Sequence, residues 1–352
     1  MLKRIARYFF IVFGLVVLWA STWQPAMEYI SDARSKDTWW GIYQRVNGDL
    51  VSITYLDNIE KLRSIADYTV TRPEYNGPRK TELYLYADSY GWHINDTAFA
   101  ALSGFHFTDK YFGGTYQLDT AKRNILILLF TEREIQEYMD TSIFNTFHSA
   151  SEKPAEIAAA PVAQHSSIDL SWISNPKMNT HIEYNLFNYQ FLMPVFKEKA
   201  EFNYYVFKRA SGSVALSDDG DFLFFGDAVN TNRMGSTYYT GLRPDHISKL
   251  VYNVNRIYDH YKQEGFREVY LSIIPNPSTV IQPAGYNQLI PLIQSSPDLR
   301  MKTIDMYSIF KQTPATWFRP GDTHWSNKGL RSWLGEVNSR LVAPDQTHST
   351  KK

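Results

Sequence analysis

Short apolar runs that alternate with helical stretches are the feature that most constrains the fold of this chain. The runs lie at 82–86, 106–112, 124–130, 268–274 and 302–306. Apolar runs of this length are typical of strands buried on both faces, and helices between them make the strands parallel. We therefore expect an α/β protein with a three-layer parallel sheet that helices cover on both sides.

Helical periodicity fills the gaps between these runs. Aromatic residues are also concentrated between 184 and 207, and the stretch 214–225 predicts a hairpin that turns at Asp218-Asp219-Gly220. We take this aromatic-rich part as an insertion that caps the sheet. The predicted helices lie at 56–62, 95–102, 245–263 and 285–295, with one more ending near Met139 and a last one ending near Leu341.

Composition divides the chain into segments around the predicted sheet. An alanine-rich stretch with a proline, 158–163, is typical of a linker or mobile loop. The predicted segments are a signal-anchor helix at 1–25, a membrane-proximal segment at 26–80, the first part of the core at 81–148, the linker and inserted cap at 149–244, the second part of the core at 245–345, and a disordered tail at 346–352.

The N-terminus has the pattern of a membrane anchor. Lys3, Arg4 and Arg7 precede the apolar stretch 8–23, and basic residues on this side keep the N-terminus in the cytoplasm. The stretch is short for a spanning helix, which needs about 20 residues. A cleaved signal peptide is therefore the alternative, although two tryptophans occupy the place where small residues would mark cleavage. We expect a single-pass anchor, with the rest of the chain outside the cytoplasm, in the periplasm or at the cell surface.

Composition excludes several classes of function. Lys plus Arg and Asp plus Glu both number 36, so the formal net charge is zero and gives no basis for nucleic-acid binding. The chain has no cysteine, which excludes disulfides, thiolate zinc sites, a cysteine nucleophile and lipid attachment through cysteine. Aromatic residues make up 15% of the chain, which suits interior packing and also surfaces on which sugars stack. We expect no cofactor.

A glycine-bracketed stretch from Gly321 to Gly329 carries the clearest chemical signal. It contains Asp322-Thr323-His324-Trp325, and an aspartate two residues before a histidine can orient the imidazole for work as a general base. The best nucleophile is Ser89, directly after the predicted strand 82–86. Because active sites in such sheets gather at the carboxyl ends of the strands, we expect Ser89, His324 and Asp322 to form a triad.

Other polar residues and glycines follow the predicted strands. Since parallel strands end at one edge, these residues are expected to bind substrate or donate hydrogen bonds to an oxyanion. They are Gly113, Gly114, Thr131 and Asn276.

The sequence resembles the SGNH (GDSL-like) hydrolase superfamily over residues 81–148 and 245–341. Asp-Thr-His-Trp is the signature of its membrane-anchored, alginate O-acetyltransferase-like branch, and Ala87-Asp88-Ser89 lies in the place of the family's Gly-Asp-Ser block. The resemblance implies a flavodoxin-like sheet with Ser89 as nucleophile, His324 as base and Asp322 as orienting acid. It also implies that the backbone N–H of Ser89 and that of Gly113 or Gly114 stabilise the oxyanion.

The chain departs from the family's pattern at three places. Ala87 replaces the glycine that usually precedes Asp-Ser in the family. The third block normally reads Gly-x-Asn-Asp, whereas this chain has Phe130-Thr131-Glu132-Arg133, which leaves Thr131 or Asn276 as substitutes for the asparagine donor. The Asp-x-His-Trp block follows the serine here, as in ordinary SGNH hydrolases, but precedes it in the acetyltransferase-like branch.

Each of these residues also has a structural interpretation. Ser89 fits a turn or helix cap, Asp322 a cap for the last helix, and Asn276 a rigid turn between two prolines. Glu132 and Arg133 fit a buried ion pair or a site for a substrate carboxylate. Asp322 and His324 could also bind a metal together with His93 or His106, although nothing in the sequence fixes a third ligand.

Together these observations predict an extracytoplasmic serine esterase or O-acyltransferase that acts on envelope or exported polysaccharide. The expected partners are a glycan acceptor and an acyl donor, and the resemblance implies a membrane-embedded acyltransferase as the source of the acyl group. A non-catalytic envelope scaffold or carbohydrate-binding protein with a degenerate SGNH fold is the alternative, because the third-block asparagine is missing. A metallohydrolase is a third hypothesis.

Overall fold

The computed structural model describes most of the 352-residue chain. The described residues are 2–23, 47–64, 68–138, 143–150, 192–210 and 212–342, with the single residues 182 and 186. The predicted linker at 158–163, most of the aromatic run between 184 and 191, and the predicted tail at 346–352 lie outside them.

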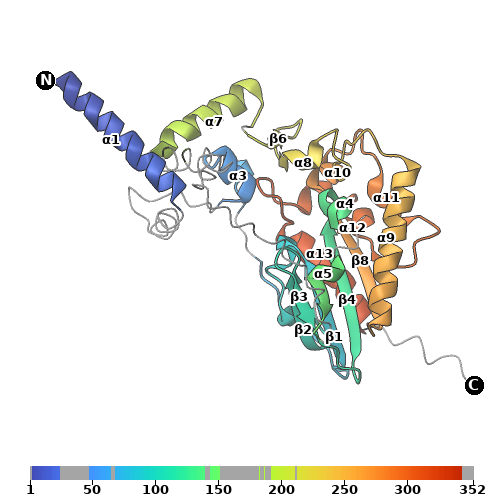
Figure 1. Ribbon diagram of the computed structural model, residues 1–352. Coiled ribbons are helices and arrows are strands. Elements are labelled where there is room, and N and C mark those ends of the chain that lie inside the picture. Colours follow the sequence, from blue (N-terminus) through green and yellow to red (C-terminus); the bar gives the residue numbers. More distant parts are fainter. Residues whose placement is uncertain are drawn as a thin grey trace, which may run out of the picture.

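Five parallel strands form the central sheet (Figure 1). Their order is β2-β1-β4-β8-β9, so in chain order the strands of this sheet run 2-1-3-4-5, the order of doubly wound sheets of the flavodoxin type. This confirms the predicted α/β class with a parallel sheet. The strands are β1 (Thr81–Ala87), β2 (Leu102–Asp109), β4 (Arg123–Thr131), β8 (Glu268–Ile274) and β9 (Lys302–Ile304).

The central strands are apolar along their whole length because both faces of the sheet are covered. Every residue of β1 is buried, as is every residue of β4 after Arg123. β1 pairs with β4 from Thr81 opposite Arg123 to Tyr86 opposite Leu128. This register brings the carboxyl ends of β1 and β4 to the same edge of the sheet.

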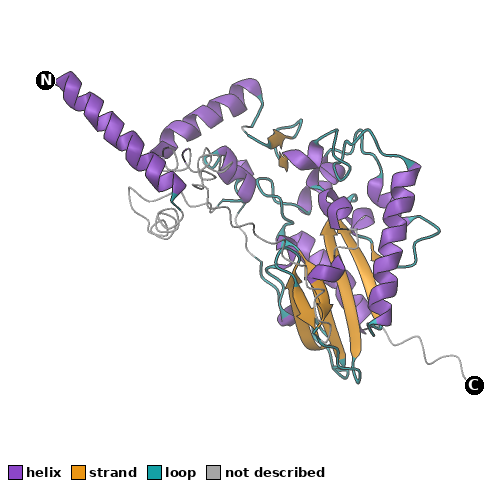
Figure 2. Ribbon diagram, in the orientation of Figure 1, coloured by secondary structure: helices purple, strands orange, loops and turns teal. Residues whose placement is uncertain are grey.

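Helices cover both faces of the sheet and complete three layers (Figure 2). On one face, α9 (Pro244–Gln263) and α11 (Leu289–Gln294) pack on side chains such as Tyr84 and Leu128. On the other face, α12 (Met306–Phe310) and α13 (Asn327–Val342) pack on Leu85 and Leu129. The Trp333 indole N–H donates to Ser272 Oγ at 3.0 Å, which ties α13 to β8.

A smaller hydrophobic core joins two segments that are far apart in the chain. The segment 47–64 contributes α3 (Asp49–Thr54) and the 3₁₀ turn η2 (Glu60–Leu62). They pack on α7 (Met193–Phe207) and on the antiparallel hairpin of β6 (Val214–Leu216) and β7 (Leu223–Phe225), through Leu50, Val51 and Tyr204 among others. The predicted hairpin is thus confirmed, and the inserted segment shares a core with the segment that follows the N-terminal helix.

Two local predictions are wrong. The stretch 95–102 is no helix, because the Asn95 side chain caps a 3₁₀ turn, η4 (Asp96–Ala98), and β2 then starts at Leu102 instead of 106. β2 is an edge strand with half-exposed residues, so it lacks a continuous apolar run. The predicted helix at 56–62 is replaced by α3, which ends at Thr54, and by the single turn η2.

The helix α1 (Leu2–Thr22) is long and apolar enough to cross a membrane, and a signal sequence has the same properties. The remaining elements are short. They are η3 (Ser89–Gly91), β3 (Gly114–Tyr116), η5 (Glu132–Glu134), α4 (Ile135–Tyr138), α5 (Ile143–Thr146), β5 (Phe147–Ser149), α8 (Gly226–Val229), α10 (Pro277–Ile281) and η7 (Pro314–Thr316).

Candidate active site

Ser89 lies directly beyond the carboxyl end of β1. The Asp88 carboxylate accepts a hydrogen bond from the Tyr90 N–H at 2.9 Å and so starts the tight turn η3, of which Ser89 is the first residue. β1 has β2 on one side and β4 on the other, so the connection after β1 leads to one side of it and the chain after β2 crosses back to the other. Such switch points of doubly wound sheets open a crevice for ligands.

His324 connects Ser89 to Asp322. Its Nε2 lies 2.8 Å from Ser89 Oγ, and its Nδ1 lies 2.6 Å from Asp322 Oδ1. The backbone N–H of His324 also donates to Asp322 Oδ1, at 2.9 Å. A carboxylate at Nδ1 holds the proton on that nitrogen and leaves Nε2 to accept the serine proton. The structure therefore brings the three residues predicted as a triad into hydrogen-bond contact.

Asp322 is held as a carboxylate by its surroundings. Burial alone would raise its pKa, but the hydrogen bonds from His324 and the charges of His324 and Arg319 outweigh burial and lower the pKa. The Arg319 guanidinium lies 2.9 Å from Asp322 Oδ1, and the Asp49 N–H donates to Oδ2 at 3.3 Å. Asp322 can therefore balance a positive charge on His324 at neutral pH.

Aromatic side chains fix the loop that carries His324. The Tyr90 ring lies 5.1 Å from the His324 ring and 5.0 Å from the Trp325 ring, and its hydroxyl donates to the Thr323 carbonyl. Trp325 is only 1% exposed and packs on Trp333 of α13. The tryptophan of the Asp-Thr-His-Trp motif is therefore a core residue that anchors the histidine loop.

A cluster of buried charges lies beside the serine turn. The Lys110 ammonium binds Glu134 and lies 3.4 Å from Asp88 Oδ2. Burial raises the pKa of Asp88 to about 6. Burial also opposes ionisation of Glu134, but the contact with Asp88 and the charges of Lys110 and Arg133 lower its pKa to about 2. Glu134 thus carries the negative charge that Lys110 needs in this buried place.

Gly113 and Gly114, the two glycines predicted to line the site, lie in the turn before β3 and at its first residue, and their contact with an oxyanion stays a prediction. The Gly113 N–H donates to the Asp109 carbonyl at 2.8 Å, and its φ of 68° suits glycine. Gly114 begins β3 and pairs with Phe147 of β5. Within the described residues, no protein acceptor engages the backbone N–H of Ser89. The Ser89 N–H therefore has its donor available for a ligand in this part of the site.

Thr131 and Asn276 also use their donors within the protein. The Thr131 hydroxyl donates to Glu134 Oε2 at 2.7 Å, and the Asn276 side-chain amide donates to the Gly235 carbonyl at 3.0 Å. The Asn276 backbone N–H donates to Glu132 Oε2 at 2.9 Å. Their proposed contact with an oxyanion stays a prediction. For the Thr131 hydroxyl it requires the hydrogen bond to Glu134 to be exchanged, whereas the Asn276 amide has a second N–H.

Glu132 and Arg133 do not pair with each other. Glu132 is fully buried and accepts hydrogen bonds from the Asn276 N–H and the Thr279 hydroxyl, and burial raises its pKa to about 7. Arg133 lies instead 4.0 Å from Glu134 Oε1 and over the ring of Phe225. The ion pair considered from the sequence is therefore wrong.

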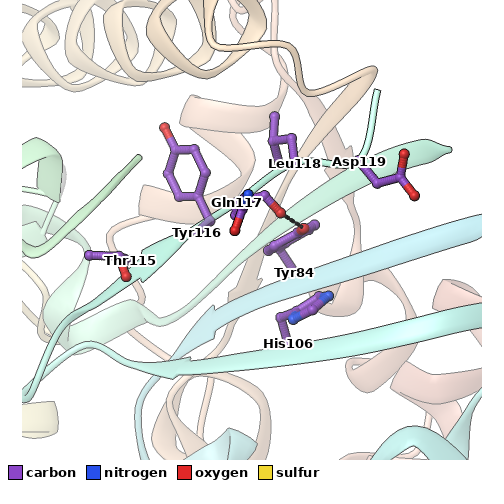
Figure 3. A pocket seen from close by; sticks show the side chains of 7 residues that line it. All are labelled: Tyr84, His106, Thr115, Tyr116, Gln117, Leu118 and Asp119. Atoms are coloured by element: carbon purple, nitrogen blue, oxygen red, sulfur yellow. Dashed lines mark hydrogen bonds between the residues drawn. The ribbon is translucent and has the colours of Figure 1, made fainter. Parts of the chain in front are cut away.

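The histidines considered as further metal ligands make other contacts. The His93 ring packs on Tyr68 at 4.8 Å, and burial together with the charges of His324 and Arg319 lowers the pKa of His93. His106 Nε2 lies 2.8 Å from Glu82 Oε2. The His106 ring lines a hollow of about 530 Å³ beside β3, where Tyr84 also lies (Figure 3).

The carboxylates of Asp49 and Asp322 and the His324 imidazole are the group in the described chain whose ligand atoms lie close enough to share a cation, within 4.8 Å. The Arg319 guanidinium already holds Asp322 Oδ1 at 2.9 Å, and His324 Nδ1 faces the same oxygen. A second positive charge beside Arg319 would be repelled. This donor set therefore fits an oriented histidine better than a metal centre.

Three exposed aromatic residues follow the carboxyl ends of β1 and β2. Trp92 is 57% exposed, and its indole N–H donates to Asp109 Oδ2 at 2.5 Å. Tyr111 is equally exposed, its N–H donates to Asp109 Oδ1 at 2.8 Å, and Phe112 beside it is 86% exposed. Aromatic rings of this kind, fixed at a surface, suit stacking on a flat ligand face. We call Trp92, Tyr111 and Phe112 the aromatic wall.

Sequence reasoning missed four charged residues of this site. Arg319 precedes Asp322 by three residues, and that proximity was a usable signal. Asp49, Lys110 and Glu134 had none, because their partners lie far away in the sequence, 273 residues in the case of Asp49 and Asp322.

Comparisons of the chain with known protein families, with curated proteins and with solved structures find no match.

Proposed function

We propose that the protein is a serine esterase or O-acyltransferase of the SGNH type. The observation that carries the proposal is the chain of contacts from Ser89 Oγ through both nitrogens of His324 to Asp322 Oδ1, at 2.8 and 2.6 Å. A hydroxyl, an imidazole and a buried carboxylate in this order form an activated nucleophile on many unrelated folds. The strand order and the Asp-Thr-His-Trp motif support the SGNH assignment.

The reaction has two halves. In the first, His324 Nε2 takes the proton of Ser89 while Ser89 Oγ attacks the acyl carbonyl, and the resulting oxyanion faces the Ser89 N–H. The tetrahedral intermediate collapses when His324 returns the proton to the leaving oxygen, which leaves an acyl ester on Ser89. In the second half, His324 Nε2 takes a proton from an acceptor hydroxyl or from water while that oxygen attacks the acyl carbonyl. The bond from the carbonyl to Ser89 Oγ then breaks, and His324 gives the proton to Ser89 Oγ, which frees Ser89.

The proposed acceptor is an envelope or exported polysaccharide. The aromatic wall supports a sugar acceptor, because its exposed rings follow the same strand ends as Ser89, and Asp109 holds the Trp92 ring while Glu134 holds the Tyr111 hydroxyl. The basic N-terminus followed by the apolar helix α1 supports an anchor with the α/β domain outside the cytoplasm. This placement suits an acyl donor delivered by a membrane-embedded acyltransferase, as the resemblance implies.

A second candidate is a carbohydrate-binding scaffold without catalysis. The observation that favours it is that the Gly113 N–H, the Thr131 hydroxyl and one N–H of the Asn276 amide donate to acceptors within the protein. An oxyanion site with the Ser89 N–H alone would be weak, since the loss of one such donor costs about 10²- to 10³-fold in rate. The two candidates differ in whether Ser89 turns over an ester.

The test uses the full chain in detergent micelles with p-nitrophenyl acetate as substrate. We expect turnover by the wild type and its loss in Ser89→Ala and His324→Ala, whose thermal unfolding should match that of the wild type. Ser339→Ala, at an exposed position of α13, is the matched control and should keep full activity. Equal turnover in the wild type and in Ser89→Ala would contradict the proposal. Addition of polysaccharide acceptors during turnover then separates transfer from hydrolysis.

A further inference from the structure

The segment 47–64 binds the loop that carries the triad's acid and base. Val51 N–H donates to the Gly321 carbonyl at 3.0 Å, and Gly321 N–H donates to Ser64 Oγ at 3.0 Å. The Ser64 carbonyl accepts from Arg319 Nη1 at 3.2 Å. The segment therefore contacts the loop on both sides of Gly321, immediately before Asp322.

Asp49 makes the contacts that are nearest to the chemistry. Its carboxylate accepts the Thr323 N–H at 2.8 Å and the Thr323 hydroxyl, while its own N–H donates to Asp322 Oδ2 at 3.3 Å. Thr323 lies between Asp322 and His324 in the chain. Asp49 thus fixes the backbone between the acid and the base and also supports the acid directly.

The Asp49 carboxylate also adds negative charge next to the imidazole. Its Oδ2 lies 3.9 Å from His324 Nδ1, on the side away from Ser89 Oγ, which lies at Nε2. The other titratable or charged groups that face His324 are Asp322, Arg319, His93 and Tyr90. Negative charge near Nδ1 favours the imidazolium that forms when His324 takes a proton. Because Asp49 is 41% exposed on its side chain, solvent weakens this effect.

The segment and the loop pack so closely that neither Gly321 nor Gly48 has room for a side chain. A Cβ on Gly321 would lie 2.0 Å from Val51 Cγ2 and 2.1 Å from the Leu62 carbonyl oxygen. A Cβ on Gly48 would lie 2.6 Å from the Gly321 carbonyl oxygen, and Gly48 has a φ of 111°, which favours glycine. The two backbones therefore meet directly, and this contact sets the place of Asp49 against Thr323.

On the basis of the proposed serine chemistry, we propose that Asp49 is a positioning residue of the triad, which orients the Asp322-Thr323-His324 loop and stabilises the protonated state of His324. The segment that follows the N-terminal helix thereby becomes part of the active site.

The test compares wild type, Asp49→Asn, Asp49→Glu and Ser64→Ala as full chains in detergent micelles. Diethyl pyrocarbonate modifies neutral imidazoles, and peptide mass spectrometry measures the modification rate of His324 between pH 5 and 8, whether or not Ser89 is active. Ser64→Ala removes a hydrogen bond between the same segment and the same loop but no charge, so it is the matched control. A fluorophosphonate then measures the reactivity of Ser89 in each variant.

We expect Asp49→Asn to move the midpoint of the His324 profile about half a pH unit lower and to slow fluorophosphonate labelling of Ser89 about tenfold. Asp49→Glu should restore the midpoint in part, and Ser64→Ala should leave it unchanged. A wild-type midpoint in Asp49→Asn would overturn the positioning role, even if Ser89 labels normally. A shifted midpoint without any labelling of wild-type Ser89 would uphold the contact of Asp49 with the histidine and refute the proposed serine chemistry instead.

Discussion

His324 Nε2 lies 2.8 Å from Ser89 Oγ across 235 residues of sequence. The serine follows β1, and the histidine lies in the loop before α13, the helix that covers the same sheet. The contact therefore depends on the whole parallel sheet being formed and on α13 packing against it. The local sequence predicts that each residue lies next to the end of a strand or helix, and only the tertiary fold brings the two side chains together.

Replacement of Asp322 by asparagine should abolish most of the activity without unfolding the protein. The amide cannot hold the proton on His324 Nδ1 as the carboxylate does. The imidazole is then left in the wrong tautomer, with its proton on Nε2, the nitrogen that must accept the serine proton. We expect a fall of about 10³- to 10⁴-fold in p-nitrophenyl acetate turnover, by analogy with other triads. Asp245→Asn, at the exposed start of α9, is the control and should be fully active. A tenfold or smaller effect of Asp322→Asn would argue against the orienting role.

Two glycine-to-alanine substitutions should have opposite effects. In Gly321→Ala the new methyl group would meet Val51 and the Leu62 carbonyl at about 2 Å, so the loop must move away from the segment 47–64. We expect esterase activity to fall at least tenfold and the free energy of unfolding to decrease. Gly335→Ala adds a methyl group to open space on α13 and should raise the free energy of unfolding by about 0.5 to 1 kcal/mol. Urea unfolding followed by circular dichroism measures both, and an active, stable Gly321→Ala would contradict the fit.

The buried carboxyl of Glu132 should make stability depend on pH. Burial raises its pKa from the usual 4.5 to about 7, so the folded protein retains a proton that the unfolded chain releases between these values. The stabilising effect of this proton is full below about pH 4.5 and is lost as the pH rises through about 7. The shift in pKa corresponds to a loss of about 3 kcal/mol in the free energy of unfolding.

Glu132→Gln is neutral at every pH and lacks this dependence. Relative to the wild type, it should therefore be more stable at pH 8 than at pH 4.5. Chemical unfolding at both values measures the difference, with the exposed Glu60→Gln as control. The same relative stability at both pH values would show that Glu132 titrates normally.

The aromatic wall should matter for sugars and not for small esters. Trp92→Ala removes an exposed ring three residues after Ser89 but no group of the triad. We expect unchanged turnover of p-nitrophenyl acetate and a loss of about fivefold or more in acyl transfer to a polysaccharide acceptor, since stacked aromatic contacts contribute about 1 kcal/mol. Tyr252→Ala removes a similarly exposed ring from α9 and is the control. Equal rates of acyl transfer by Trp92→Ala and by the wild type would show that the aromatic wall is not part of the acceptor site.

The sequence predicts the central strands well because burial on both faces gives them continuous apolar runs. β8 begins and ends at the predicted residues, and β1 and β4 differ by one residue at each end. β2 was misplaced because an edge strand alternates polar and apolar residues, and the Asn95-capped turn before it has the local composition of a helix start. For the same reason, strand prediction is weakest at the edges of a sheet.

The candidate site was predictable only where motif and strand end coincide. Ser89, Asp322 and His324 carry both signals, and the structure brings them together. The role of Asp49 depends on a contact across 273 residues, and the buried Lys110 has no local pattern that distinguishes it from a surface lysine. Such residues are found only when the packing of distant segments is known.

The most direct test of the proposed chemistry is to trap the acyl group on Ser89. Full-length protein is mixed with p-nitrophenyl acetate, quenched in acid within seconds and digested, and the peptide that contains Ser89 is analysed by mass spectrometry. We predict an acetyl ester on Ser89 in the wild type and none in His324→Ala. In the wild type, the ratio of acetylated Ser89 to released p-nitrophenol should be highest at the shortest times. An unmodified Ser89 in the wild type, with the same peptide recovered in full, would contradict the account.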